Sequence, residues 1–159
     1  MTTVAAPPAV RFFVVGKPVP KGSVIVRHQH GSSDGMGHCS CRQWPVPVAD
    51  AKLSEWDALV ATAAKRAMHQ RPPFGAAVLV SMTFFYERPK SHTAAQREYR
   101  YVIAKGRNDS DKLARAILDA CTSAAVWWDD SQAMLGHVFK VYCAEDDVPG
   151  VAVTLEALP

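Results

Sequence analysis

Four aspartates in the second half of the chain could together hold a divalent cation. Asp109 and Asp111 are two residues apart at the expected start of a helix, and Asp129 and Asp130 follow an apolar segment that could bring them alongside. A hard cation such as Mg²⁺ binds a few carboxylate oxygens and completes its coordination with waters and substrate phosphate oxygens. Such an ion lowers the pKa of its bound water and neutralises charge that develops on a phosphate. The pattern therefore favours phosphodiester hydrolysis.

The same aspartates also have a purely structural interpretation. Asp-x-Asp at a helix start is most often a cap, and the Asp-Asp-Ser-Gln sequence at residues 129–132 is typical of a turn. Without a cation, clustered carboxylates would repel one another. Spacing alone leaves both interpretations open.

Composition indicates a single globular domain over residues 1–159, because the chain is 48% hydrophobic and 21% charged. The first ten residues lack the basic start and apolar stretch of a signal peptide, and no run approaches the length of a membrane span. We therefore expect a cytoplasmic protein without membrane contact. Four cysteines in that compartment favour free thiols or a metal site. Cys121 and Cys143 lie within apolar patterns and are expected to be buried.

Charge is distributed unevenly along the chain. Residues 1–108 contain fifteen Lys and Arg and six acidic residues, a net charge of +9, whereas the remaining residues carry a net charge of −6. One surface could thus attract a polyanion while a nearby acidic cluster holds a cation, although charge blocks of this size also occur on ordinary solvated surfaces.

A segment rich in His, Cys and Gly at residues 27–47 is expected to form a long loop. It contains enough nitrogen and sulfur ligands for a tetrahedral Zn²⁺ site. Its His-x-His and Cys-x-Cys spacings are shorter than the usual ones, so a flexible Gly-rich loop is the alternative. The candidate zinc ligands are His28, His30, His38, Cys39 and Cys41.

Periodicity predicts the regular elements that must position these residues. Apolar residues at helical spacing predict amphipathic helices over residues 53–67 and from a cap at residues 109–111 to Cys121. A basic turn at 17–23 and a loop at 87–97 connect the remaining elements. Strands are expected at residues 10–15, 76–86, 99–103, 134–143 and 148–155.

The acidic residues lie in a sequence that resembles the RusA family of Holliday junction resolvases. Typical motifs of that family are Gly-x-Pro-x-Pro-Lys-Gly, Lys-Pro-Asp-x-Asp-Asn-Leu-x-Lys, Leu-Asp-Ala, and Asp-Asp-x-Gln followed by a Lys. In this chain they correspond to residues 16–22, to 109–115 for the last seven positions of the second motif, and to 118–120, 129–132 and Lys140. The resemblance covers most of the chain but not residues 27–47.

This resemblance implies a metal-dependent endonuclease that cuts four-way DNA junctions. Asp109, Asp111 and Asp130 would bind Mg²⁺, for which Mn²⁺ could substitute, with Asp129 as a neighbour. The expected fold is a small single α/β (α+β) domain with a mixed β-sheet packed by two main helices, and it is expected to form a homodimer. The alternatives are a less selective branched-DNA nuclease and a branched-DNA-binding protein that has lost cleavage.

Three positions depart from the family motif: Asn108 replaces Pro, Lys112 replaces Asn and Arg115 replaces Lys. Arg115 keeps the positive charge expected at the scissile phosphate but exchanges a compact ammonium for a planar fork. Its structural alternative is an ion pair with Asp111 or Asp119.

Basic residues on loops and strand ends are expected to bind DNA phosphates without reading the bases. Of the adjacent Trp127 and Trp128, one could wedge into a junction, and at least one is expected to pack in the core. The candidate DNA-binding residues are Lys17, Lys21, Lys105, Arg107, Lys112 and Lys140.

Overall fold

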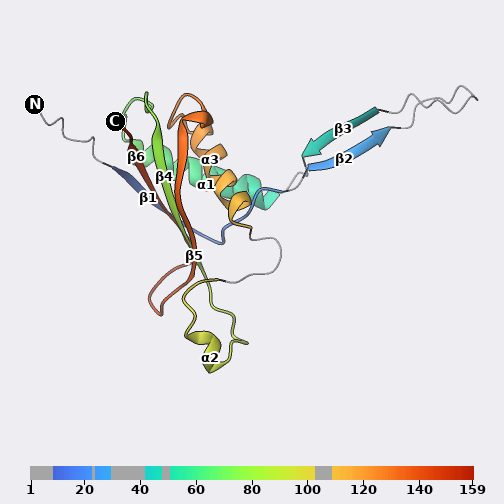
Figure 1. Cartoon of the computed structure of the whole chain (residues 1–159), viewed down its shortest axis with the longest axis vertical. Helices are drawn as coiled ribbons and strands as arrows, with labels where there is room; N and C mark the ends of the chain where they lie inside the picture. The colour runs from blue at the N-terminus through green and yellow to red at the C-terminus, as the bar shows by residue number, and fades with distance from the viewer. Residues whose placement is uncertain (1–8, 23, 30–41, 48–50, 103–108) are drawn as a thin grey trace, which may run out of the picture. The chain divides into compact units, whose positions relative to one another are not determined.

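A four-stranded mixed sheet forms the centre of the main unit in this computed structural model, which describes residues 9–22, 24–29, 42–47, 51–102 and 109–159 (Figure 1). The strand order is β1-β6-β4-β5. β6 pairs antiparallel with both β1 and β4, and β5 runs parallel to β4. The strands are β1 (Val10–Val15), β4 (Val78–Tyr86), β5 (Ala133–Tyr142) and β6 (Gly150–Ala157).

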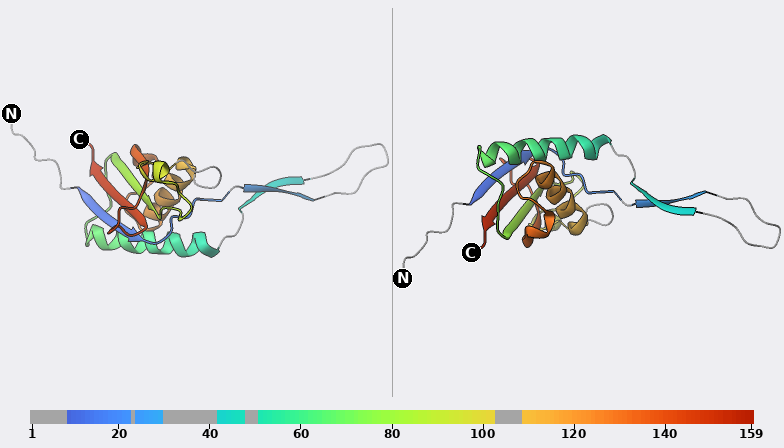
Figure 2. Two further views of the ribbon diagram at one scale, coloured as in Figure 1. Left: turned by 90° about the horizontal axis from the view of Figure 1, so that it is seen from below. Right: turned by 90° about the horizontal axis from the view of Figure 1, so that it is seen from above.

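Two long helices cover one face of this sheet. They are α1 (Ala51–Met68) and α3 (Ser110–Ser123), and Figure 2 shows α1 running along the sheet. Alternate β4 residues from Val78 to Tyr86 are buried, as expected for a strand with one face on the core. They join Trp56, Val60, Leu113 and Ile117 of the helices in one cluster. The predicted α+β fold with a mixed sheet and two main helices is confirmed.

Two short helical segments complete the main unit. α2 (Ala94–Arg97) lies in the expected 87–97 loop and begins at Thr93, whose hydroxyl accepts a hydrogen bond from the Gln96 backbone N–H. The 3₁₀ helix η1 (Asp130–Gln132) connects α3 to β5. No helix in the described part of the chain is both long and apolar enough to cross a membrane.

The chain divides into two compact units, residues 1–21 with 52–159 and the smaller unit 22–51. The smaller unit corrects the expected 27–47 loop, because it contains an antiparallel pair, β2 (Val24–Gln29) and β3 (Arg42–Pro47). β-Branched residues at 24–26 favour a strand, and the prolines of β3 are tolerated in a two-stranded ribbon, where both strands are edges.

The strand expected at residues 99–103 is also corrected. Among its described residues, 99–102, only Tyr101 forms a β-bridge, with Val141. Two flanking backbone bonds, from the Val102 N–H to the Lys140 oxygen and from the Tyr142 N–H to the Arg100 oxygen, each span 2.9 Å. The alternation of Tyr99 and Tyr101 thus produces one isolated bridge to β5 rather than a strand.

Candidate active site

The first turn of α3 lies at the end of the sheet where β4 and β5 terminate. Because β4 and β5 are parallel, the chain must return between them, and α3 makes that return antiparallel to both strands (Figure 1). Side chains in the first turn of α3 thus lie at the carboxyl ends of two parallel strands, where α/β sheets commonly bind ligands.

Asp109 is the N-cap residue of α3, but its side chain makes no capping hydrogen bond. The predicted cap position is confirmed and the predicted capping role is not. One carboxylate oxygen of Asp109 instead lies 3.4 Å from the Nζ of Lys112, and both side chains are partly exposed. Asp111 lies in the same helical turn and is exposed. Both carboxylates are accessible to a ligand.

Asp129 and Asp130 form a turn at the start of η1. Asp129 is the N-cap, and its Oδ1 accepts a 2.9 Å hydrogen bond from the Ser131 backbone N–H. Hydrogen bonds from the Ser131 side chain and backbone hold the pKa of Asp129 below its usual value. The turn interpretation of this motif is therefore confirmed for Asp129, whereas Asp130 is the exposed first residue of η1.

Gln132 fixes this turn, a role that the sequence did not suggest although Gln132 lies in the quoted motif. Its Oε1 accepts hydrogen bonds from the backbone N–H groups of Trp128 (2.8 Å) and Asp129 (3.1 Å). Its Nε2 donates to the carbonyl oxygens of Phe74 (3.0 Å) and Ala76 (3.1 Å). The amide thus holds the acidic turn against the chain entering β4.

The two pairs of aspartates occupy opposite ends of α3. Asp109 and Asp111 are at its first turn, whereas η1 leads into β5 at the other end of the sheet. A helix of 14 residues is about 21 Å long. Accordingly, no group of three or more His, Cys, Asp or Glu within the described residues is arranged to hold a metal ion.

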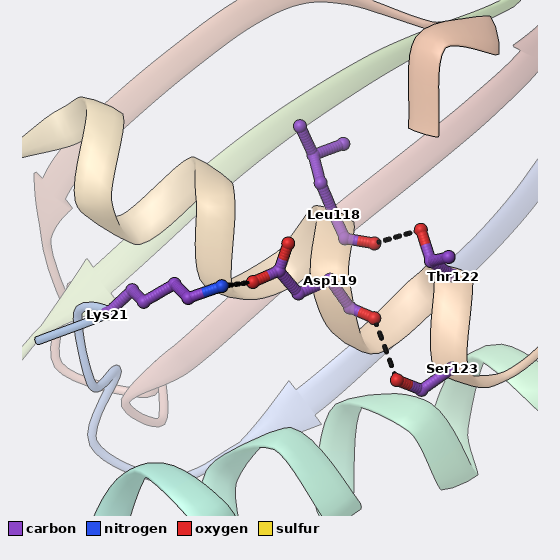
Figure 3. A network of polar contacts seen from close by, with 5 residues as sticks. All are labelled: Lys21, Leu118, Asp119, Thr122 and Ser123. Atoms are coloured by element: carbon purple, nitrogen blue, oxygen red, sulfur yellow. Dashed lines mark hydrogen bonds and ion pairs between the residues drawn. The ribbon is translucent and has the colours of Figure 1, made fainter. Parts of the chain in front are cut away.

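Lys21 and Asp119 form an ion pair between the segment after β1 and α3 (Figure 3). The backbone N–H of Lys21 also donates to the carbonyl of Lys112 over 3.1 Å. Asp57 of α1 lies nearby. Burial raises the pKa of Asp57 and the positive charge of Lys21 partly opposes this rise. Lys21, a predicted DNA ligand, is thus engaged within the protein.

The other basic candidates have different surroundings. Lys17 and Arg115 are exposed, and Arg115 makes no ion pair with Asp111 or Asp119 in the described part of the chain. The structural alternative for Arg115 is therefore wrong. Lys140 is half-buried in β5. Lys105 and Arg107 lie outside the described residues.

The zinc prediction falls largely outside the described residues. His30, His38, Cys39 and Cys41 are not described, and His28 is located only as a β2 residue whose backbone pairs with Gln43. Zinc binding by this segment stays a prediction.

Trp127 and Trp128 point in different directions. Trp127 is buried and its Nε1–H donates to the Thr122 hydroxyl over 2.8 Å, which confirms that one of the pair packs in the core. Trp128 is 75% exposed beside the acidic turn.

Cys121 is buried as expected, which raises the pKa of its thiol to about 12, whereas Cys143 is only partly buried.

A family model matches the sequence of this chain. The model of the endodeoxyribonuclease RusA matches residues 16–156. The chain belongs to the RusA endodeoxyribonuclease family. RusA membership makes the protein a nuclease, of a family that acts on branched DNA such as Holliday junctions. A comparison with curated proteins found no match.

Proposed function

We propose that this RusA-family protein resolves four-way DNA junctions by Mg²⁺-dependent hydrolysis of a phosphodiester bond in each of two strands. The observation that carries this proposal is the Asp109 carboxylate, which occupies a helix cap without capping the helix. An Asp in this position ordinarily accepts a backbone N–H bond. Not engaged by the helix backbone and partly exposed beside Asp111, this carboxylate provides the hard oxygen donors that Mg²⁺ prefers.

The residues around these carboxylates suit a phosphate substrate. Bound Mg²⁺ would supply an activated water and neutralise charge on the phosphate. Lys112 forms an ion pair with Asp109 in the free protein. When a phosphate is bound beside Asp109, the Lys112 ammonium can contact a phosphate oxygen instead. Arg115, one turn further along α3, is exposed and unpaired within the described residues, so its guanidinium is available to the scissile phosphate.

Asp130 joins this site in our proposal from a second copy of the chain. Within one chain, Asp130 and Asp111 lie at opposite ends of α3. The edge of β5 is open only before Lys140, because residues 100–102 pair with its last residues. A two-fold axis that pairs this open part antiparallel with its copy would bring the η1 of each chain toward the α3 start of the other. Met134, Leu135 and Phe139 of β5 are each about half exposed, which supports β5 as the interface.

Mixed dimers test this arrangement. Asp111→Asn and Asp130→Asn proteins should each fail to cut a synthetic junction with Mg²⁺. Mixed before assembly, they should regain nicking, because one of the two sites then contains both native carboxylates. A site built within one chain would carry a lesion in both halves of every mixed dimer, and no activity would return. Wild-type protein that cuts linear duplex as fast as the junction would contradict junction selectivity.

The cytoplasmic location of the protein stays a prediction.

A further inference from the structure

The end of the sheet that bears the α3 start also contains two adjoining hollows, of about 310 and 150 Å³. They share Tyr99 and Tyr142 as lining residues. We name the smaller one, with its shared walls, the tyrosine pocket. It is lined by His92, Gln96, Tyr99, Tyr101 and Tyr142.

The walls of the tyrosine pocket are fixed by Arg88, which follows the end of β4. Its guanidinium lies over the Tyr142 ring, 4.6 Å from the ring centroid. Its two terminal nitrogens donate to the backbone oxygens of Gln96 (3.2 Å) and Tyr99 (3.0 Å). Arg88 thus joins the loop that carries Tyr99 to the last residue of β5, so the Tyr142 ring and the loop backbone are held in place before a ligand arrives.

Several groups in the pocket have unused binding capacity. Tyr99 and Tyr101 are more than half exposed, although they are large aromatic side chains. The His92 ring packs edge-on against Tyr142, with centroids 5.2 Å apart. Its Nδ1 is nevertheless buried without a hydrogen-bond partner within the described residues. Flat aromatic surfaces beside an unsatisfied ring nitrogen and the Gln96 amide suit a planar ligand with polar edges.

Charge around the larger hollow argues against a simple phosphate site. Arg88 and Arg100 line it together with Glu98 and Asp147, so the two signs balance. Arg88 is occupied by backbone oxygens, and Asp147 accepts a 2.9 Å hydrogen bond from the Ala144 N–H. The hollows therefore offer ring faces and hydrogen-bonding groups rather than a net positive charge.

From this geometry we infer that the tyrosine pocket binds an unpaired nucleobase of the DNA substrate. This inference rests on the proposed function, because it assigns a substrate contact to the same nuclease. Unstacked bases can stack on aromatic side chains and present their edges for hydrogen bonds. A linear duplex keeps its bases stacked and paired, whereas a branch point can release one. The pocket therefore favours branched DNA at the sheet end that holds Asp109 and Asp111.

The test uses the full chain without divalent metal, so that binding is separated from cleavage. Two probes carry 2-aminopurine at an unpaired position, one at the centre of a four-way junction and one in a single-stranded oligonucleotide. Stacking in the pocket should quench the probe fluorescence with the wild-type protein. Tyr99→Ala should abolish the quenching and weaken junction binding by roughly 5- to 150-fold, the fold-change that corresponds to one lost base–aromatic stack.

Two variants control for other effects. Tyr99→Phe keeps the ring and should quench as the wild type does, while Leu59→Ala removes an exposed apolar side chain of α1 and should change nothing. Equal quenching by wild type and Tyr99→Ala, or none with wild type on either probe, would overturn the pocket assignment. Wild-type quenching without junction cleavage after Mg²⁺ is added would retain the pocket and overturn the proposed function alone.

Discussion

Lys21 and Asp119, 98 positions apart, form an ion pair that joins the segment after β1 to the middle of α3. The backbone of Lys21 simultaneously contacts Lys112, two helical turns earlier. Lys21 thus contacts α3 at two positions, Lys112 and Asp119. The first of them lies in the same helical turn as Asp111. Lys21 is the last residue of the main unit before residue 22 begins the smaller unit.

Replacing Lys21 should change both stability and a neighbouring titration. Lys21→Met removes a partly exposed ion pair, and we expect the free energy of unfolding to fall by up to about 1 kcal/mol. The charge of Lys21 lowers the pKa of Asp57, so this pKa should rise further in the variant. A folded-state pKa above the unfolded one makes stability fall as pH rises through that interval. The loss should therefore be larger at pH 7 than below pH 3.8.

Denaturant unfolding at both pH values and an NMR titration of Asp57 measure these effects. Lys17→Met is the matched control, because Lys17 is an exposed lysine of the same segment. An unchanged Asp57 titration in Lys21→Met would show that the two groups do not interact in solution.

Asp111→Asn should separate binding from cleavage. Losing one carboxylate weakens the metal site, and several kcal/mol of transition-state stabilisation correspond to a rate loss of more than about a hundredfold. Junction binding in a gel shift should persist or tighten, since basic residues still contact phosphates. Asp146→Asn, an exposed acid in the turn before β6, is the control. Wild-type cutting by Asp111→Asn would exclude Asp111 from the metal site.

Gln132→Ala should release the acidic turn. The variant loses four hydrogen bonds to backbone groups around η1 and the entry to β4. We expect a stability loss of about 1–3 kcal/mol, because four hydrogen bonds are lost together and the one to the Phe74 oxygen is partly buried. Cleavage should fall more than junction affinity, because Asp130 is no longer held in place. Gln132→Glu keeps the size and one set of acceptors, so it should retain the bonds from Trp128 and Asp129. Normal cleavage by Gln132→Ala would show that η1 needs no such support.

The zinc hypothesis for residues 28–41 has a direct check. Protein purified without chelators should contain about one Zn²⁺ per chain by elemental analysis. The double variant Cys39→Ser and Cys41→Ser should release it and lower the melting temperature. Metal-free wild-type protein would end this hypothesis.

Product analysis on a plasmid that extrudes a cruciform tests the dimer. Two sites acting in one binding event should yield linear DNA directly, whereas an independent single-site nuclease accumulates nicked circles first. Light scattering on the same preparation measures the mass. A monomer that leaves nicked circles as the lasting product would contradict a paired mechanism.

Local patterns predicted the elements of the main unit but not their mutual placement. The apolar spacing of Leu113 and Ile117 gave α3, and the alternation of Val78 to Phe84 gave β4, because each pattern reflects burial on one face. The strands at 24–29 and 42–47 were missed because their glycine-rich surroundings and prolines resemble a loop. Tyr101 showed strand alternation yet pairs at one position only.

For the candidate site, too, the sequence indicated the residues but not their placement relative to one another. The resemblance to the RusA family pointed to Asp109, Asp111 and Asp130. It could not show that α3 separates Asp130 from the other two, since this follows from the parallel pairing of β4 with β5. Similarly, the role of Gln132 depends on carbonyls 56 and 58 positions away. Long-range hydrogen bonds leave no periodic trace in a sequence.

The central position of β6 has a consequence for biosynthesis. This strand, residues 150–157, is the shared partner of β1 and β4. The parallel pair β4–β5 can form as soon as both strands have been synthesised, whereas β1 joins the sheet only through β6. At roughly 5–20 residues per second, β1 must wait several seconds for its partner. During that interval β1 is an unpaired strand, which is open to pairing with another chain.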